Sequence, residues 1–397
     1  MSQKKLAVKA PAKVQPAVKP TRTVAVKPKG SGLFGMIRRL FSMVLLLAIS
    51  MPLALILWLE TVDWRAPPDA LPRPSSDATA RASGEPKPVG DLDTAPHLQD
   101  WTIEEPALGQ IGFTVQKPAQ LEEEERLPVI ILLGGAPEGR QALTYMPPVG
   151  QNAVISLDWP MPVPDDMPRG WDLIPAAPSL RTDILAAPGQ IAAIYHWARS
   201  QPWVDADRIS LVSVSLGALI APAAQYLIQE QTEGQPLAAT LLAFGGAGID
   251  QMVRANPTLA QSPIFEGRDW AQEAVAWAAG RALYPVEPSH YLPRLVGQFM
   301  VVNASADSVI PASSVELLTN LTPSPKDTLT IDGGHIGPDP ETPRILRTLT
   351  SVATGWLIGQ GVVNPPITEP SEPESADGII DEIDAVETEA VEVEALD

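Results

Sequence analysis

The stretch Ser213-Val214-Ser215-Leu216-Gly217 decides the fold of this chain. It follows an apolar run of strand length at residues 209–212, and it opens an apolar stretch of helical length at residues 218–228. A serine with small residues two positions away on both sides fits a sharp strand-to-helix turn, because bulky neighbours would hold the two backbones apart. The pattern predicts that Ser215 stands on such a turn. The alternative is that Ser215 is only the N-cap of the following helix.

An acid and a base follow this serine in the chain. Of the four histidines, His97 and His196 precede Ser215, whereas His290 and His335 follow it. His335 comes after two glycines at the end of a short alternating run, residues 328–331, so we expect a flexible loop that carries an imidazole. His196 lies in a helix-like segment, and we interpret it and His290 as packing or surface residues.

Asp307 is the candidate acid. It comes just past the apolar run 299–302, and catalytic groups of open α/β sheets gather at the carboxyl ends of the strands. Two alternatives stay open. Asp307 is also suited to a turn before Pro311, and Asp332 is a rival acid three residues before His335.

The serine turn, the acid loop and the Gly-Gly-His loop resemble the α/β-hydrolase family, and within it the dienelactone hydrolase and prolyl-oligopeptidase-like serine esterases. The segment 201–209 before the serine is also typical of that group, and the resemblance covers roughly residues 125 to 360. Two departures are visible. Ser213 stands where Gly is commoner, and no His-Gly pair follows the apolar run at residues 129–133.

The resemblance implies a catalytic triad in which Ser215 is the nucleophile, His335 takes its proton and Asp307 holds the imidazole. The implied reaction is cleavage of an ester or related acyl bond through an acyl-enzyme, although the same triad also cleaves amides in peptidases. The substrate would be a small-molecule or lipid acyl compound. The alternative is a catalytically inactive hydrolase-fold protein that binds an envelope partner or lipid.

The resemblance also implies an oxyanion hole made of two backbone N–H groups. One is that of Leu216, at the start of the helix after the serine, where the helix dipole is positive. The second comes from the loop after the run 129–133, from Gly135 or Ala136. The lack of a His-Gly pair leaves this choice open.

The rest of the chain between residues 99 and 362 predicts one α/β domain, with a mostly parallel sheet and helices on both faces. Helix-like segments alternate with apolar runs, and Pro188 suits the first turn of a helix that ends near Arg199. The apolar runs of strand length are residues 129–133, 153–157, 209–212, 239–244, 299–302 and 328–331. An insertion at residues 248–285 is either a cap over the active site or a set of ordinary core helices, and it carries Met252, Phe265, Trp270 and Trp277.

The amino-terminal region predicts a membrane anchor. Residues 40–59 form an apolar run without any charged side chain, and a helix of this length can cross a bilayer core of about 30 Å. Residues 1–39 carry only basic charges and predict a disordered cytoplasmic arm, with the catalytic domain on the extracytoplasmic side. A cleavable signal peptide and a buried core helix are the alternatives. Residues 60–98 predict a proline-rich linker, and residues 363–397 an acidic disordered tail.

Composition excludes several functions. The chain has no cysteine, so it forms no disulfide and no thiol nucleophile, and it lacks the histidine spacings of common zinc sites. It also lacks a glycine-rich dinucleotide or phosphate loop, so we expect neither a metal nor a cofactor. The net charge of -19 argues against a nucleic-acid partner.

Overall fold

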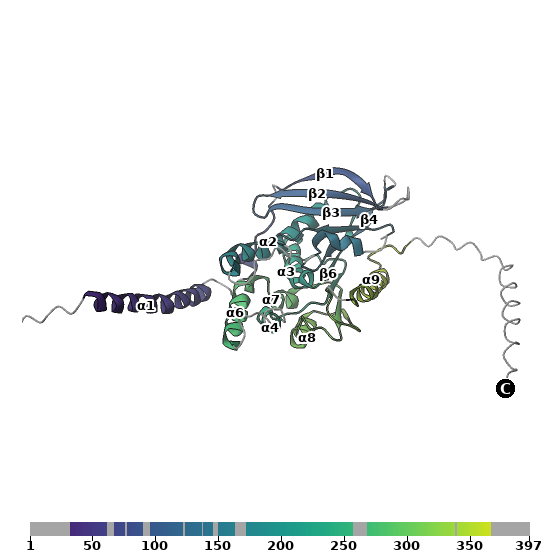
Figure 1. Cartoon of the computed structure of the whole chain (residues 1–397). Coiled ribbons are helices and arrows are strands. Elements are labelled where there is room, and N and C mark those ends of the chain that lie inside the picture. The colour runs from purple at the N-terminus through teal and green to yellow at the C-terminus, as the bar shows by residue number, and fades with distance from the viewer. Residues whose placement is uncertain are drawn as a thin grey trace, which may run out of the picture. The chain divides into compact units, whose positions relative to one another are not determined.

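The computed structural model describes residues 32–61, 67–75, 78–89, 96–121, 124–136, 138–145, 150–162, 172–256, 268–337 and 340–366 (Figure 1). The chain divides into two units, Met1–Thr61 and Val62–Asp397. Most of the predicted basic arm and nearly all of the predicted acidic tail lie outside the described residues.

The described part of the first unit is the helix α1, Gly32–Thr61. Within it, Gly35–Trp58 has a mean hydropathy of 2.6, and none of its most apolar window is buried. The helix is therefore long and apolar enough to cross a membrane. It begins before residue 40, where we had expected the apolar segment to start.

The second unit is built on one sheet whose described strands run in the order β1-β2-β3-β5-β4-β6-β7-β8-β9. From β5 onward in that order, neighbouring strands are parallel, whereas β1, β2, β3 and β5 pair antiparallel. The mostly parallel sheet predicted from sequence is confirmed. The strands are β1 Thr79–Pro88, β2 His97–Glu105, β3 Gly109–Lys117, β4 Leu127–Leu133, β5 Ala153–Leu157, β6 Val204–Val214, β7 Thr240–Ala243, β8 Phe299–Ala304 and β9 Lys326–Ile331.

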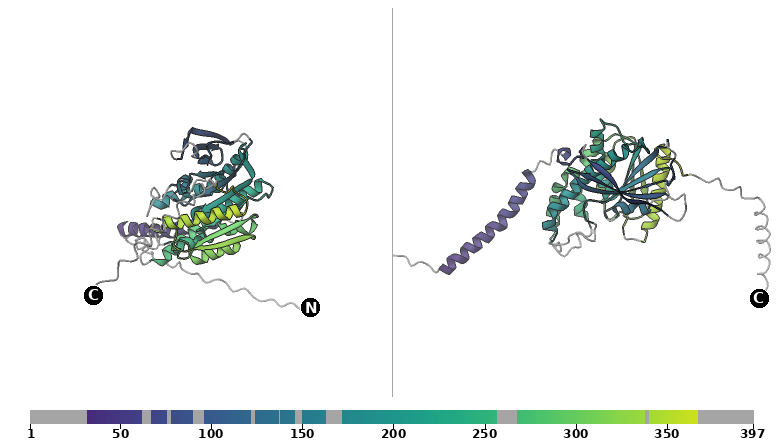
Figure 2. Two further views of the ribbon diagram at one scale, coloured as in Figure 1. Left: turned by 90° about the vertical axis from the view of Figure 1, so that its right-hand side faces the viewer. Right: turned by 90° about the horizontal axis from the view of Figure 1, so that it is seen from above.

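Helices cover both faces of the sheet, as predicted. Because side chains alternate along a strand, Ile131 of β4 packs with the helices on one face, and Ile130 packs with α9 on the other. Figure 2 shows α9 on one side of the sheet and α2 and α3 on the opposite side. The helices are α2 Leu173–Arg199, α3 Leu216–Gln231, α4 Ile249–Ala255, α6 Asp269–Ala282, α7 Pro288–Tyr291, α8 Ala312–Leu321 and α9 Thr342–Gly359, with short 3-10 turns such as η1 Pro67–Ala70 and η2 Gly139–Tyr145.

The helix before β6 is longer than the sequence indicated. We expected Pro188 in its first turn, but α2 begins at Leu173 and contains both Pro178 and Pro188. A proline inside a helix removes one backbone hydrogen bond. The helix continues through Pro188 because the residues around it are fully buried against the sheet, including Ala187 and Ile191.

The segment predicted to be a linker differs from that expectation. It contains β1, which joins the sheet by pairing with β2, and Leu71, which is only 3% exposed. A side chain at Gly189 of α2 would come within 2.3 Å of the Pro72 carbonyl oxygen, so this segment lies directly on the helix. The sheet therefore starts before residue 99.

The insertion after β7 forms α4 and α6, which pack on each other so closely that a Cβ at Gly280 would lie 2.9 Å from the Cβ of Asp250. Met252 is buried in the core, whereas Trp270 is 72% exposed. Met252 thus has the ordinary core role that we left open, and Phe265 lies outside the described residues.

Candidate active site

Ser215 lies on the turn between β6, which ends at Val214, and α3, which begins at Leu216. Its backbone has φ 54° and ψ -113°, a conformation that residues with a Cβ rarely adopt. Such strain persists only where the surrounding structure over-determines it. The sharp strand-to-helix turn that the sequence predicted is therefore present at this serine.

The small residues around Ser215 have the roles that the pattern indicated. A Cβ at Gly217 would lie 2.5 Å from the carbonyl oxygen of Leu133 on β4, so no side chain fits there. Ser213, which replaces the commoner glycine, is fully buried, and its hydroxyl donates to the carbonyl oxygen of Leu241 at 2.6 Å. The substitution therefore leaves no polar group without a partner.

The three residues singled out from the sequence meet at this turn. The Oγ atom of Ser215 lies 2.9 Å from Nε2 of His335. The Nδ1 atom of the same imidazole lies 2.8 Å from Oδ2 of Asp307. The side chains of His335 and Asp307 are only 8% and 5% exposed, so water has little access to the pair. The arrangement is a continuous chain of hydrogen bonds from hydroxyl to carboxylate.

The carboxylate of Asp307 is held by more than the imidazole. Its Oδ1 accepts backbone hydrogen bonds from Val309 and Ile310, both at 2.8 Å. Burial raises the pKa of this carboxyl group, but the hydrogen bonds from His335, Ile310 and Val309 outweigh burial and lower the pKa below its usual value. Asp307 is therefore ionised at neutral pH. The turn before Pro311, which we considered as an alternative role for Asp307, is thus present, and its N–H groups bind the carboxylate.

Asp332, the rival acid, is bound elsewhere. Its Oδ1 accepts a hydrogen bond from the hydroxyl of Ser305 at 2.9 Å. The backbone N–H of Ala306 also donates to the carbonyl oxygen of Gly333 at 2.9 Å. These bonds join the loop of the acid to the loop of the histidine. The loop that we expected to be flexible is thus fastened to its neighbour.

Gly333 and Phe244 complete the surroundings of the imidazole. Gly333 has φ 137°, and a Cβ there would lie 2.7 Å from Cδ1 of Ile345. Phe244, just after β7, is buried with φ 52° and stands edge-on to the ring of His335, with 6.2 Å between ring centroids. Nothing in the sequence pattern pointed to Phe244, because its position follows from an unusual backbone conformation.

The loop after β4 is oriented by a tryptophan to which no sequence motif pointed. Nε1 of Trp159 donates to the carbonyl oxygen of Gly135 at 2.9 Å. A trans peptide points its C=O and N–H in opposite directions, so the N–H of Ala136 points away from Trp159. The backbone N–H of Gly135 lies near the carboxyl group of Glu138 and acts to lower the pKa of that group. Among the described contacts, none involves the N–H of Ala136, the other expected donor.

Glu138 is the second carboxyl group near the imidazole. Burial raises its pKa, and the nearby backbone N–H groups of Glu138 and Gly135, together with His335, only partly oppose this rise. Burial also raises the pKa of Asp158 at the end of β5, where Arg140 binds it at 2.8 Å. Within the described ranges, no three His, Cys, Asp or Glu side chains lie close enough together to hold a metal ion.

Two of the other three histidines, His196 and His290, have partners outside this cluster. His196 on α2 hydrogen-bonds the side chain of Gln231, and His290 on α7 packs against the ring of Tyr284 at 4.0 Å between centroids. Burial lowers the pKa of both imidazoles. Both are packing residues, as we interpreted them.

Comparison with known proteins places this arrangement in a known fold. No protein-family model and no curated protein matches the sequence. Among solved structures, acetyl xylan esterase 1 from Thermoanaerobacterium sp. JW/SL YS485 superposes with a TM-score of 0.52 at 15% identity, over 75% of this chain and 92% of that chain. An acetyl xylan esterase from Paenibacillus sp. R4 gives a TM-score of 0.51 at 17% identity, over 75% and 93% of the two chains. This chain has the α/β-hydrolase fold.

The α/β-hydrolase fold accounts for the position of the cluster. In this fold the serine stands on a strand-to-helix turn, and the acid and the histidine follow it in the chain in that order. Ser215, Asp307 and His335 occur in this order after β6, β8 and β9. The carboxyl ends of these parallel strands lie at the same edge of the sheet, which brings together three residues that are far apart in sequence.

Proposed function

We propose that this protein is a serine hydrolase that cleaves carboxylic esters through an acyl-enzyme. The observation that carries the proposal is the unbroken hydrogen-bonded chain from Ser215 to His335 to Asp307, at 2.9 and 2.8 Å. A hydroxyl is a weak nucleophile until a base takes its proton, and an imidazole within hydrogen-bond reach can take it. The strained backbone of Ser215 supports the proposal, since such strain is concentrated at functional sites.

The reaction follows from these positions. Nε2 of His335 accepts the hydroxyl proton while Oγ of Ser215 attacks the ester carbonyl carbon. The ionised Asp307 holds Nδ1–H and stabilises the imidazolium that forms. The imidazolium then gives its proton to the departing alkoxide, which leaves an acyl group on Ser215. Water, deprotonated by the same imidazole, attacks that ester and releases the acid and the free serine.

The oxyanion of each tetrahedral intermediate requires two donors, and we propose the N–H groups of Leu216 and Ala136. The N–H of Leu216 belongs to the first residue of α3, where helical N–H groups have no partner within the helix. The N–H of Ala136 is favoured over that of Gly135 because the latter lies near the carboxyl group of Glu138, which can accept from it. Removing one donor of this type typically costs about 3 to 4 kcal/mol of transition-state stabilisation.

A fluorophosphonate probe, which reacts with activated serines, tests the proposal. We expect the full chain to be labelled and Ser215→Ala to be unlabelled. Ser213→Ala is the matched control in the same pentapeptide, because its hydroxyl is buried and bonded to Leu241. In an ester assay, Ser215→Ala should lower kcat by a factor on the order of 10⁶. Absence of labelling in the wild-type chain would exclude an activated serine.

The scissile bond is tested by matched substrates. Esters have a better leaving group than amides, and p-nitrophenyl esters of increasing chain length would measure both activity and acyl preference. We expect kcat/KM on an ester to exceed that on the anilide with the same acyl group. Equal or greater activity on the anilide would make the protein a peptidase or amidase.

We further propose that α1 anchors the enzyme, with the amino terminus in the cytoplasm and the catalytic unit outside it. The apolar window in Gly35–Trp58 supports an anchor. The charged residues before it are all basic, which supports this orientation. A phosphatase reporter that is active only outside the cytoplasm, fused after Asp397, should be active. Activity of a cytoplasmic reporter at that position, or release of the chain from membranes by alkaline carbonate, would contradict the anchor or its direction.

A further inference from the structure

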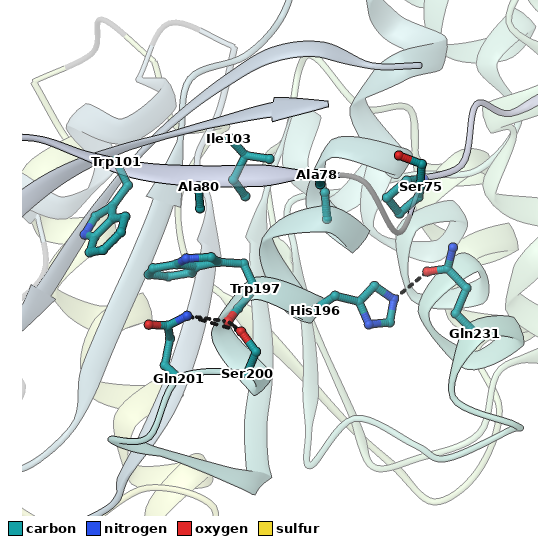
Figure 3. Close-up of a pocket in the computed structure, with 12 residues that line it drawn as sticks. Ser75, Ala78, Ala80, Trp101, Ile103, His196, Trp197, Ser200, Gln201 and Gln231 are labelled. Atoms are coloured by element: carbon teal, nitrogen blue, oxygen red, sulfur yellow. Dashed lines mark hydrogen bonds between the residues drawn. The ribbon is translucent and has the colours of Figure 1, made fainter. Parts of the chain in front are cut away.

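A cavity lies at the end of the sheet opposite Ser215. It occupies about 660 Å³ between β1 and β2 on one side and the last turns of α2 on the other (Figure 3). The helix α2 ends at Arg199 just before β6 begins, whereas Ser215 follows the far end of β6. The eleven residues of β6 span about 30 Å or more at the rise of a β-strand. The cavity and the catalytic cluster are therefore separate sites.

The cavity exists because small side chains of β1 face large ones of β2 and α2. Ala80 pairs with Ile103 across the antiparallel ladder, and Ala82 pairs with Trp101, so the alanines lie on the face of β1 that looks toward α2. All ten residues of β1 are exposed. In Figure 3 the ring of Trp197 lies in the middle of the cavity, beneath Ala80. The inner face of β1 therefore leaves space above an indole ring.

Two indole rings that line the cavity, those of Trp101 and Trp197, pack against other aromatic side chains. Trp101 and Trp197 are tilted against each other, with 4.9 Å between ring centroids, and Trp197 also contacts Phe113 at 4.7 Å. Both indoles are fixed by these neighbours, so a ligand that stacks on them would not have to order them. Rigid aromatic surfaces of this kind contribute contact area at little entropic cost.

Uncharged polar groups line both ends. At one end, Nε2 of Gln201 donates to the carbonyl oxygen of Trp197 at 3.0 Å, which leaves Oε1 as an acceptor. At the other end, Oε1 of Gln231 is bound to His196, which leaves Nε2 as a donor. No described residue binds these two outer amide atoms. Burial lowers the pKa of His196, which keeps this imidazole neutral at pH 7.

This lining restricts the class of ligand. Among the residues that the structure describes, the lining contains no Lys, Arg, Asp or Glu side chain, so these residues offer no counter-charge to a phosphate, carboxylate or amine. A purely apolar chain would strip water from the amides of Gln201 and Gln231 and give nothing in return. A pyranose ring satisfies both requirements, because it has an apolar C–H face and a rim of neutral hydroxyl groups that both donate and accept.

We propose that this cavity binds a neutral oligosaccharide, with a sugar ring stacked on Trp197 and its hydroxyl groups bonded to Gln201 and Gln231. The volume falls in the range of about 300 to 1,000 Å³ that is usual for small-molecule sites. The site requires no contribution from Ser215, so it stands or falls independently of the proposed hydrolase reaction.

Binding is measured with the full chain in phosphatidylcholine nanodiscs, which contain no sugar. The probes are maltotetraose, cellotetraose and N-acetylated chitotetraose. Binding of each probe is measured by saturation-transfer NMR and by calorimetry. We expect at least one probe to bind. Ala80→Trp, which fills the space above Trp197, should weaken that binding by about tenfold or more.

Two further variants keep the result interpretable. Arg81→Trp places the same side chain at the next position, on the outer face of β1, and should leave binding unchanged. Gln231→Leu removes the outer amide without filling the cavity and should weaken binding by about fivefold, which corresponds to one neutral hydrogen bond. If Ala80→Trp lowers the thermal unfolding temperature sharply, Gln231→Leu carries the test.

Several results would overturn the proposal. One is the absence of binding by all three probes up to about 10 mM, an affinity weaker than one ordinary stacked ring and its hydrogen bonds should give. Another is binding that neither Ala80→Trp nor Gln231→Leu changes. A third is binding of a tetraalanine peptide, weakened by the same variants, in place of the sugars. Loss of ester hydrolysis in any variant has no bearing on these outcomes.

Discussion

The parallel and the antiparallel parts of the sheet differ in how deeply their strands are buried. The parallel strands β4 and β5 are buried along their whole length, whereas β1, in the antiparallel part, is exposed at every residue. The strained conformation of Ser215 occurs at the end of the buried part, where Gly217 of α3 packs so closely on Leu133 that no side chain fits between them. The exposed part instead has an open cavity. Tight packing holds the proposed nucleophile in place, and loose packing leaves space for a ligand.

The largest expected effect is on kcat, and it tests which carboxylate on the tightly packed side supports the imidazole of His335. Asp307→Asn keeps the shape of the side chain but favours the wrong imidazole tautomer, so kcat for an ester should fall by a factor on the order of 10⁴. Asp332→Asn is the matched control, since Asp332 bonds Ser305 and not the imidazole. Steady-state kinetics of both variants decides the matter. A loss of activity in Asp332→Asn, with Asp307→Asn unaffected, would move the acid to the other loop.

The next effect concerns stability. Gly217→Ala forces a methyl group into the Leu133 carbonyl oxygen, and overpacking of this kind costs about 2 kcal/mol or more of unfolding free energy. Arg81→Ala on β1 removes only an exposed ion pair with Glu104 and should cost less than about 0.5 kcal/mol. Denaturant unfolding followed by tryptophan fluorescence compares them. Equal costs would mean that β1 is as tightly constrained as the serine turn.

A smaller effect is expected where the oxyanion loop is oriented. Trp159→Phe removes the hydrogen bond to Gly135 and should lower kcat about tenfold while KM changes little, because the lost contact positions a donor that acts in the transition state. Trp270→Phe on the exposed face of α6 is the control. A rise in KM with unchanged kcat would show that Trp159 acts in substrate binding instead.

The smallest effect is a pH dependence. Because the pKa of Glu138 is raised by burial above its ordinary 4.5, the folded state binds this proton more tightly than the unfolded state does. The contribution of Glu138 to stability is therefore fully present below that ordinary value and is lost as pH rises through the raised pKa. Glu138→Gln should gain stability relative to wild type from pH 4 to about pH 7. Denaturation midpoints across this range measure the difference, and a difference that stays constant would contradict the assignment.

The sequence predicted the parallel half of the molecule well. Residues 153–157 coincide with β5, and the runs at 209–212 and 299–302 lie inside β6 and β8. Buried parallel strands are apolar on both faces, so they appear as continuous apolar runs. The same strands end at Ser215 and near Asp307, which is why the candidate triad followed from their order. Its catalytic roles stay predictions.

The antiparallel half was not predicted, for physical reasons. The strand β1 has the sequence TARASGEPKP, with no apolar alternation because neither face is buried. Its pairing with β2 comes from backbone hydrogen bonds, which the side-chain pattern does not record. The contacts of Trp159 and Glu138 likewise depend on backbone orientations in the loop after β4. Such orientations are set by tertiary packing rather than by local sequence.

The segment between the apolar helix and the sheet has a practical consequence for anyone who wishes to release the catalytic unit by proteolysis or truncation. Leu71 is buried, Pro72 lies against α2, Arg73 binds Glu230 at 2.9 Å, and the N–H of Ser75 donates to Glu105 at 2.8 Å. A fragment that starts at residue 99 would lack this segment and β1. Strand β2 would then be an unpaired edge of the sheet, and exposed edge strands promote aggregation. A fragment that starts near Pro67 keeps both.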